Sequence, residues 1–219
     1  MMRLRLLCLL SMLVGIGVAP SGVDAQSPDN APIILLIGGD IWTVTPHDGA
    51  FTRLTTNAHI QQFVLSPDGT RLATNYLAPL TLEDIQLNGV RSGHWANDLG
   101  LLDLETGEHT PIAEQPPGAT VSEHGISDSV HRSTPSWSPN SAHLVWGKMR
   151  YQSEHKLMRF DTASNTTTFF ANLPEQAGVP APVSAFWGTQ GIAVSSYEYE
   201  DGDWNSTNYL SFFLLFDRL

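Results

Sequence analysis

Two short turn motifs alternate along the chain, and this repetition constrains the fold more than any other feature. In the first motif an apolar run ends in an Asp, and a Gly or Asn follows four residues later: Asp103 precedes Gly107, and Asp161 precedes Asn165. Gly and Asn tolerate a positive φ, so each copy predicts a tight hairpin turn. A third copy at 45–49 has Thr in the place of the Asp.

The second motif lies between copies of the first. Residues 66–69 read Ser-Pro-Asp-Gly between two apolar runs, and residues 138–141 repeat this pattern as Ser-Pro-Asn-Ser. Ser at the first position, Pro at the second and Gly at the fourth suit a type I turn. A decayed third copy lies within 184–194. The alternation predicts short strands joined by tight turns over most of the chain.

These residues resemble the TolB-like (WD40-like) β-propeller repeat family of bacterial envelope proteins. The family's blade reads apolar-Trp-Ser-Pro-Asp-Gly, strand, loop, then a strand ending in Asp-x-x-x-Gly, and the region 33–217 can be aligned with it. The resemblance implies an all-β fold, a β-propeller of four-stranded antiparallel blades with almost no helix. The alternative is a β-sandwich, which regularly spaced short strands and turns also fit.

The repeats predict an incomplete propeller with two full and two partial blades. The full blades are expected at 62–113 and 133–173, and the partial blades at 33–56 and 183–217. Propellers typically have four to eight blades. The expectation is therefore that the chain is the N-terminal piece of a longer protein. The alternative is a small four-bladed ring in which the first and last segments pair.

The N-terminal region has the order of residues found in secretory signal peptides. Arg3 and Arg5 precede an apolar run from Leu6 to Val18, and small residues follow up to Ala25. The run is shorter than the roughly 20 residues that a membrane-spanning helix needs. We therefore expect a signal peptide at 1–25, a propeller portion at 26–219, and a periplasmic or secreted protein that is not inserted in the membrane after cleavage. Cys8, the only cysteine, would leave with the leader.

The charge of the chain argues against nucleic acid as a partner. The formal net charge is −11, with 22 acidic and 11 basic residues. A protein that follows a phosphate backbone needs a basic face. The expected partners are a protein or peptide, with a glycan as a further candidate.

The long connections are expected on one face of the propeller. In an up-and-down blade with strands a to d, the a–b and c–d turns share one face, and the b–c and d–a loops share the other. The long loops at 77–98, 114–132, 147–156 and 195–208 all belong to the second group. Function concentrates on long loops held by a rigid scaffold. The candidate binding residues on this face are His94, Trp95, Tyr151, Tyr197, Tyr199 and Trp204. The alternative is that these aromatic side chains pack against the blades.

Two loops contain side chains that could hold a metal ion. Glu123, His124, Asp128 and His131 are of types that bind zinc. Asp201 and Asp203 lie in an acidic stretch whose alternating oxygen ligands could suit calcium. Neither spacing matches an established ligand motif, so ordinary solvated loops are the favoured interpretation and no cofactor is expected, with calcium the remaining candidate.

No residue is assigned a catalytic role. The sequence has no Gly-x-Ser-x-Gly nucleophile elbow, no phosphate-binding loop and no dinucleotide-binding fingerprint. The leading hypothesis is a non-enzymatic exported module for binding or scaffolding. The alternative is the N-terminal propeller portion of a prolyl-oligopeptidase-type serine peptidase. A third hypothesis is a propeller lyase or hydrolase that acts through Asp, Glu and His at 123–131 and 198–203. Trp42, Trp137, Trp146 and Trp187 are expected in the core instead.

Overall fold

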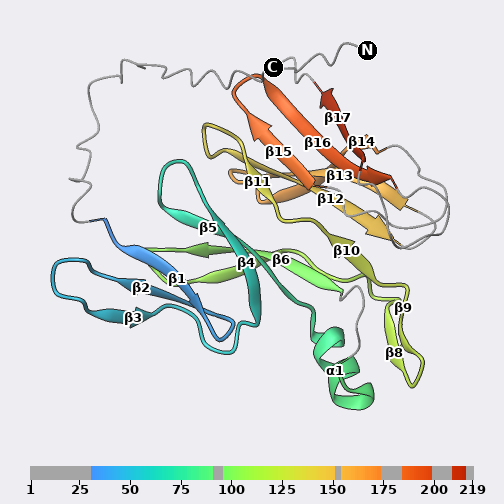
Figure 1. Ribbon diagram of the computed structural model, residues 1–219, viewed down its shortest axis with the longest axis horizontal. Helices are drawn as coiled ribbons and strands as arrows, with labels where there is room; N and C mark the ends of the chain where they lie inside the picture. The colour runs from blue at the N-terminus through green and yellow to red at the C-terminus, as the bar shows by residue number, and fades with distance from the viewer. Residues whose placement is uncertain (1–30, 91–95, 151–153, 174–183, 199–208, 216–219) are drawn as a thin grey trace, which may run out of the picture.

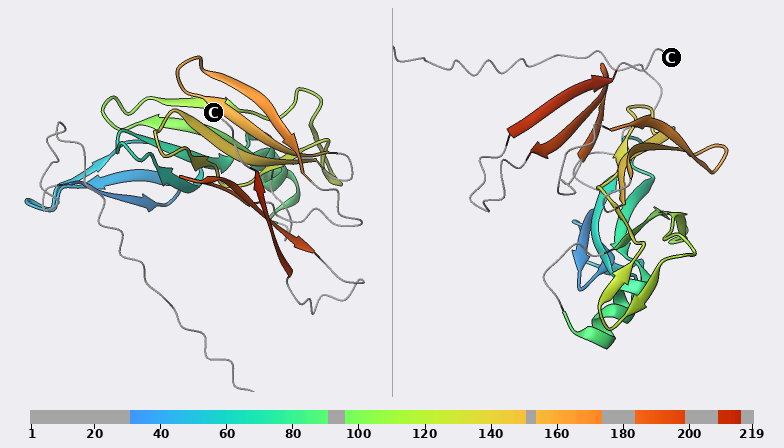
Figure 2. Two further views of the ribbon diagram at one scale, coloured as in Figure 1. Left: turned by 90° about the horizontal axis from the view of Figure 1, so that it is seen from above. Right: turned by 90° about the vertical axis from the view of Figure 1, so that its right-hand side faces the viewer.

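The computed structural model describes residues 31–90, 96–150, 154–173, 184–198 and 209–215, so the expected leader at 1–25 lies outside the described residues. Nearly all of the described elements are β-strands, and the sheets follow one another in chain order from blue to red (Figures 1 and 2). Pairing is antiparallel throughout these sheets.

The first and last described sheets have three strands each. The first contains β1 (Ile33–Ile37), β2 (Asp40–Val44) and β3 (Phe51–Arg53), in that order. The last contains β15 (Ser184–Gly188), β16 (Gly191–Glu198) and β17 (Tyr209–Leu215). They correspond to the two expected partial blades.

The two middle sheets are full blades. The second sheet has the order β4 (Ile60–Leu65), β5 (Arg71–Leu77), β6 (Asn97–Asp103) and β7 (His109–Ala113). In the third sheet, β12 (His143–Arg150), β13 (Glu154–Asp161) and β14 (Thr166–Asn172) follow a first strand that is split into β10 (Val130–Arg132) and β11 (Ser136–Trp137). The third blade therefore begins at Val130, earlier than the expected start at 133. Two full and two partial blades confirm the predicted fold class.

The a–b turns keep one hydrogen-bonding pattern although their residues differ. The backbone N–H of Gly69 donates to the carbonyl of Ser66, and that of Ser141 donates to the carbonyl of Ser138, both at 2.9 Å. Gly69 has a φ of 74°, and Ser141 occupies the same left-handed region with a φ of 58°. Ser141 can thus take the place of the glycine in the second copy of the turn.

The core consists of the interfaces between adjacent sheets. Successive residues of a strand point to opposite faces, so Leu72 of β5 packs toward the first sheet and Ala73 packs toward the third. In β12, Leu144 packs toward the second sheet, whereas Val145 packs toward the last. A sheet covered on both faces requires continuous apolar runs rather than alternating ones. β12 has such a run at 144–146, whereas the buried stretch of β5 at 72–75 also contains the polar residues Thr74 and Asn75.

The predicted tryptophan positions are largely confirmed. Trp137, Trp146 and Trp187 are buried at the sheet interfaces. Trp42 is only half-buried, and the guanidinium of Arg53 lies over its ring, 5.6 Å from the centroid.

Two of the expected long loops are shorter than predicted. β12 continues to Arg150 and β13 begins at Glu154, so most of 147–156 is a hairpin. The Glu154 carboxylate stabilises this extension, because it pairs with Lys148 and with Lys156, each at 3.0 Å. Likewise, β16 continues to Glu198 before β17 begins at Tyr209.

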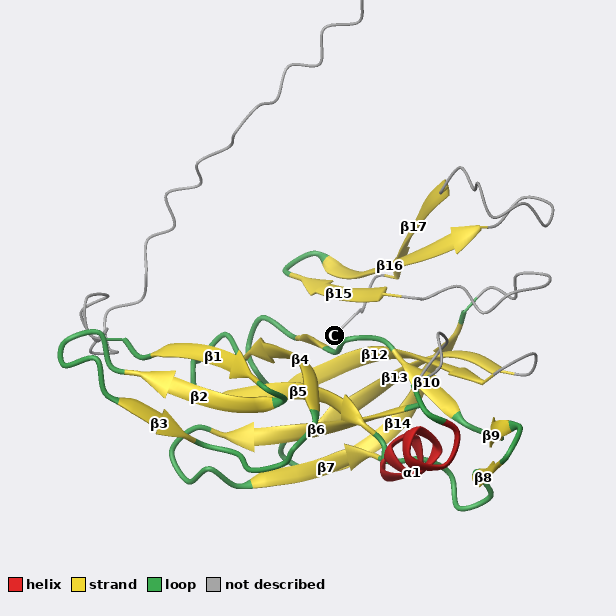
Figure 3. Cartoon of the chain, turned by 60° about the horizontal axis from the view of Figure 1, so that its bottom comes forward, coloured by secondary structure: helices red, strands yellow, loops and turns green. Residues whose placement is uncertain are grey.

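The other two long connections contain structure that the repeats do not predict. The b–c connection of the second sheet contains α1 (Pro79–Asn88), and the following d–a connection contains a hairpin of β8 (Thr120–Ser122) and β9 (Gly125–Ser127) (Figure 3). Pro79 suits the first turn of a helix. Gly89, with a φ of 74°, ends the helix by donating its N–H to the carbonyl of Ile85 at 2.9 Å.

Candidate functional site

The ends of the sheets form two different faces. We call the ends that carry α1 and the β8–β9 hairpin the loop face. The opposite ends, which carry the turns at 66–71, 138–143 and 188–191, we call the turn face. α1 lies beside β8 and β9 in Figures 1 and 3, and both strands contact it. These two elements form a platform that extends beyond the strands.

A buried charged residue lies at the base of the connection that contains the β8–β9 hairpin. The Arg132 side chain is 5% exposed and the Asp98 side chain 3%, and an Arg132 guanidinium nitrogen lies 3.4 Å from Asp98 Oδ1. The guanidinium also donates to the backbone carbonyls of Asn97 and Glu114, the latter at 2.5 Å. One side chain thus connects β10, β6 and the start of the 114–129 connection.

Side-chain amides extend this network by pairing with the backbone of β10. The Asn97 amide accepts from the N–H of Arg132 at 2.7 Å and donates to its carbonyl at 2.9 Å. The Gln115 amide pairs in both directions with Val130, at 2.8 and 2.9 Å. These amides reproduce the hydrogen bonds of a neighbouring strand, which β10 lacks on this side. The d–a connection is therefore fixed at both of its ends.

The electrostatics of the network fit a structural role. Burial raises the pKa of Asp98, although the charge of Arg132 opposes this shift. Burial and the nearby carboxylates raise the pKa of Tyr76. Burial lowers the pKa of Arg132, and Asp98 acts against that change. Perturbed groups can mark an active site, but ion-pair networks perturb pKa values as well. Here Arg132 bonds to two backbone carbonyls, and Asp98 is its ion-pair partner.

Further hydrogen bonds hold the platform together. Thr81, which is fully buried, donates its hydroxyl to the carbonyl of Ala96 at 2.6 Å. The Asn88 amide donates to the carbonyl of Ser122 in β8 at 2.8 Å and to Asp84 at 2.7 Å. Beside these fixed contacts, Leu87 and Val90 are 60% and 74% exposed. The platform therefore presents apolar side chains at the C-terminal end of a well-anchored helix.

Most of the predicted binding residues cannot be placed on this platform. Tyr197 lies in β16, where it pairs with Leu210, and not in a loop as expected. The remaining predicted binding residues, together with the two predicted calcium ligands, lie outside the described residues: His94, Trp95, Tyr151, Tyr199, Trp204, Asp201 and Asp203. Their role stays a prediction.

The predicted zinc ligands are spread over the loop face. Glu123 and His124 lie at the hairpin tip, 3.6 Å apart, with side chains 84% and 88% exposed. Asp128 pairs with Arg150 at 3.1 Å, and His131 lies in β10 opposite Met149. Within the described ranges, no three His, Cys, Asp or Glu side chains are grouped to hold a metal ion.

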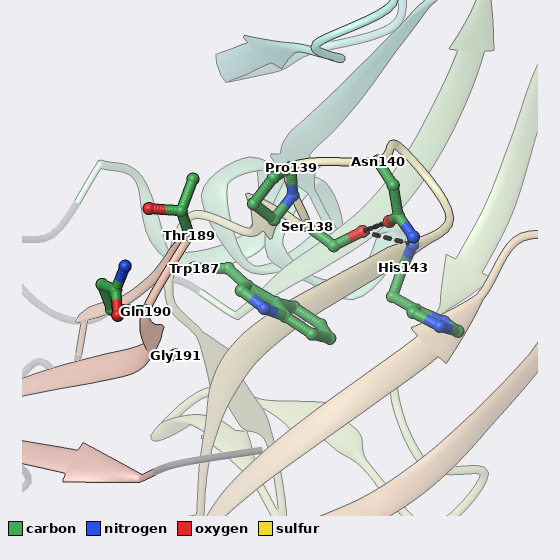
Figure 4. Close-up of a pocket in the computed structure, with 8 residues that line it drawn as sticks. All are labelled: Ser138, Pro139, Asn140, His143, Trp187, Thr189, Gln190 and Gly191. Carbon is green, nitrogen blue, oxygen red and sulfur yellow. Dashed lines mark hydrogen bonds between the residues drawn. The ribbon is translucent and has the colours of Figure 1, made fainter. Parts of the chain in front are cut away.

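The turn face has a cavity of about 360 Å³ between the third and last sheets (Figure 4). Ser138 and Asn140 line it from one turn, and Thr189 and Gln190 line it from the other. His143 and Trp187 also line the cavity, with their rings stacked at a centroid distance of 5.7 Å and an angle of 10°. Sequence reasoning did not identify this cavity. The signal available was the decayed turn motif within 184–194.

Among the described residues, no helix has the length and apolar character needed to cross a bilayer.

Comparison with known proteins gives a match by structure only. No family model matches the chain, and no curated protein matches it. Solved structures with a similar fold include dipeptidyl peptidase 4 from Porphyromonas gingivalis, with a TM-score of 0.52 and 11% identity, covering 88% of this chain and 30% of that one. The propeller domain of the Trilobed protease from Pyrococcus furiosus has a TM-score of 0.49 and 15% identity, and the match covers 81% of this chain and 46% of that one. A protein described as TolB from Agrobacterium tumefaciens has a TM-score of 0.46 and 14% identity, and the match covers 78% of this chain and 52% of that one.

The chain spans about half or less of the length of each of these structures. At such low identity the likeness concerns the fold alone. The described residues thus form part of a β-propeller of four-stranded antiparallel blades, as the repeats predict.

Proposed function

We propose that this chain is an exported, non-enzymatic propeller module that holds a protein or peptide partner on its loop face. The observation that carries the proposal is the buried Arg132 network, which fixes both ends of the connection that contains the β8–β9 hairpin. Long connections on a rigid scaffold are common binding elements. A connection that is already fixed loses less conformational entropy when a partner binds.

The chemistry of the platform favours a protein partner. Leu87 and Val90 are largely exposed beside polar groups that the helix and hairpin hold in place. Exposed apolar side chains rimmed by polar residues mark protein interaction sites. The net charge of −11 makes a phosphate backbone an unfavourable ligand. The leader-like segment at 1–25 supports export.

The non-enzymatic part of the proposal is supported by the sequence and by the site. The sequence has no nucleophile elbow. The groups with raised pKa values, Asp98 and Tyr76, belong to the network that supports the platform.

Site-specific photo-crosslinking tests the proposal. A benzoylphenylalanine is introduced at position 87 or 90 in the native host, and a matched residue on the turn face, Glu105, receives the same group. We expect one discrete protein adduct from positions 87 and 90 and none from position 105. Adding Leu87→Glu to the chain labelled at position 90 should abolish the adduct. N-terminal sequencing of the cell-envelope pool should start at Gln26.

Two results would overturn the proposal. Adducts of equal yield from positions 87, 90 and 105 would mean random collision rather than a loop-face partner. Absence of an adduct at 87 and 90, in cells that contain the processed chain, would exclude a protein partner at this platform.

A further inference from the structure

The junction between the second and third sheets is closed at the turn face. Trp137 Nε1 donates to the carbonyl of Val64 at 3.0 Å, and the guanidinium of Arg71 lies over the Trp137 ring at 5.3 Å. Ser141 completes the junction with two acceptors. Its hydroxyl accepts from the N–H of Asp68 at 3.0 Å, and its carbonyl accepts from Arg71 at 3.1 Å.

The next junction repeats only part of this arrangement. His143 follows Ser138 by five residues, as Arg71 follows Ser66, and it stacks on Trp187 as Arg71 lies over Trp137. The turn after Trp187 is shorter, however. Trp137 pairs with Leu144, seven positions later, whereas Trp187 pairs with Ile192, only five positions later.

The shorter turn leaves the place of Ser141 without an equivalent residue. The cavity of about 360 Å³ lies at this junction, and its lining includes Asn140, His143 and Gln190. Asn140 corresponds in the motif to Asp68, and His143 corresponds to Arg71. At the closed junction between the second and third sheets, Asp68 and Arg71 are the two residues that donate hydrogen bonds to Ser141. The junction between the third and last sheets thus has the residues that correspond to the two donors, but no residue that corresponds to the acceptor Ser141.

We propose that this cavity binds a short polar turn of a protein partner, which supplies the hydroxyl and carbonyl oxygens that Ser141 supplies at the closed junction. The inference rests on the proposed role of the chain as a protein-binding module, but not on the loop face. It assigns a second contact site to the turn face, with a polar peptide turn as its ligand.

The lining suits a peptide turn in size and in chemistry. The volume is at the lower end of the roughly 300–1,000 Å³ found for ligand pockets. The side-chain N–H groups of Asn140 can donate, and the amide of Gln190 and the hydroxyl of Thr189 can donate and accept, which matches the alternating N–H and C=O groups of a backbone. His143 Nδ1 lies 3.4 Å from Asp161 Oδ2 without forming a hydrogen bond, and its ring stacks on Trp187.

A sugar fits the cavity less well than a peptide. A sugar-binding site of the stacking kind needs an open aromatic face. Trp187 is only 7% exposed, and its ring is stacked on His143. The cavity therefore lacks the open aromatic face that a stacked sugar needs.

An NMR titration of the whole ¹⁵N-labelled chain tests the inference. The probe is the acetylated and amidated peptide Ser-Pro-Asn-Ser-Ala-His, which copies the turn at 138–143. We expect saturable shifts of the Thr189, Gln190 and Gly191 amides and of the Trp187 indole N–H, with a Kd on the order of 1 mM. The same peptide with alanine in place of its second serine should bind about 2- to 10-fold more weakly, because it lacks one hydroxyl acceptor.

Two matched variants locate the binding. Gln190→Tyr fills the rim of the cavity at an exposed turn position and should abolish the shifts. Glu105→Tyr makes the same kind of change at an exposed turn outside the cavity and should leave them unchanged. Unchanged spectra elsewhere in both variants show that the fold is intact.

The outcomes separate this inference from the proposed function. The inference is wrong if the peptide gives no saturable shift at about 10 mM, if Glu105→Tyr abolishes binding as fully as Gln190→Tyr does, or if glucose saturates the same amides while the peptide does not. Peptide binding that persists while the crosslinks at positions 87 and 90 are absent would remove the loop-face proposal and keep the turn-face site.

Discussion

Arg132 shows which contacts a buried charge needs within a β-propeller. Taking an ion out of water costs several kcal/mol unless its hydrogen bonds are replaced. Here the guanidinium meets Asp98 and two backbone carbonyls, so the charge is both paired and hydrogen-bonded. Arg150 provides a natural contrast, because its pair with Asp128 at 3.1 Å is partly exposed to solvent.

Removing the two arginines should have very different costs. Arg132→Met leaves the buried Asp98 carboxyl group without its cationic partner, so we expect the free energy of unfolding to fall by about 3–5 kcal/mol. Arg150→Met breaks an exposed pair and should cost less than about 1 kcal/mol. Urea unfolding followed by circular dichroism measures both. Adding Asp98→Asn to Arg132→Met should recover part of the loss. If both single variants lowered the free energy of unfolding by the same small amount, the buried charge of Arg132 would not hold the sheets together.

The a–b turns show how one element keeps its geometry with different residues. Ser66 donates its hydroxyl to Asp68 at 2.6 Å, and Ser138 donates its hydroxyl to Asn140 at 2.7 Å. In both turns the serine hydroxyl also accepts from the backbone N–H five residues later. An aspartate and an asparagine thus perform the same structural task, and they differ in charge.

That difference predicts a pH dependence for the first turn. Burial alone would raise the pKa of Asp68, but hydrogen bonds from Ser66 and Thr70 and the charge of Arg71 lower it to about 2. A pKa below that of the unfolded chain stabilises the fold at higher pH, and this stabilisation is lost as the pH falls from about 4 to about 2. Asp68→Asn should remove this part of the pH profile. The difference should stay below about 1 kcal/mol, because the side chain is 44% exposed.

Urea unfolding between pH 5 and pH 2 gives the comparison between wild type and Asp68→Asn. The reciprocal change, Asn140→Asp, should give the second turn a dependence of the same sign but smaller, because Ala142 stands where the first turn has Thr70. If Asp68→Asn and the wild type lose stability in parallel over this range, the carboxylate contributes nothing to the turn.

At the scale of the whole molecule, the described sheets stabilise one another pairwise. The second and third sheets each contribute buried residues to two interfaces, whereas the first contributes to one. In repeat architectures, stability is approximately a sum of such nearest-neighbour terms. The middle of the described chain should therefore be its most stable part.

Hydrogen exchange measures this distribution. Backbone amides of β5, β6, β12 and β13 should exchange at least about tenfold more slowly than those of β1 and β2, because opening the first sheet exposes only one interface. Mass spectrometry of peptides from each sheet resolves the two groups. Uniform exchange rates would mean that the sheets open as one cooperative unit.

The repeats predicted the parts of the fold that local residues determine. Turn residues and apolar runs located the blades, and the tryptophans before the turns proved to be core residues. The length of the hairpin at 147–156 was predicted wrongly, because it depends on the cross-strand contacts of Glu154 with two lysines. α1 was missed because its anchors, Ala96 and Ser122, lie in other segments.

The candidate sites depended still more on contacts between distant residues. Nothing local in the sequence indicates that Arg132 meets Asp98, or that Asn97 and Gln115 act as a substitute strand. The turn-face cavity lies at the turn after Trp187, which is shorter than the turn after Trp137. Its origin is recognised only by comparing the two junctions in the folded structure.

Ser141 in its left-handed conformation shows that the turn geometry does not depend on its glycine. The first turn has aspartate and glycine where the second has asparagine and serine, and the backbone hydrogen bond is the same in both. A sequence pattern that requires the residues of the first turn would therefore miss the second, although the two have the same shape.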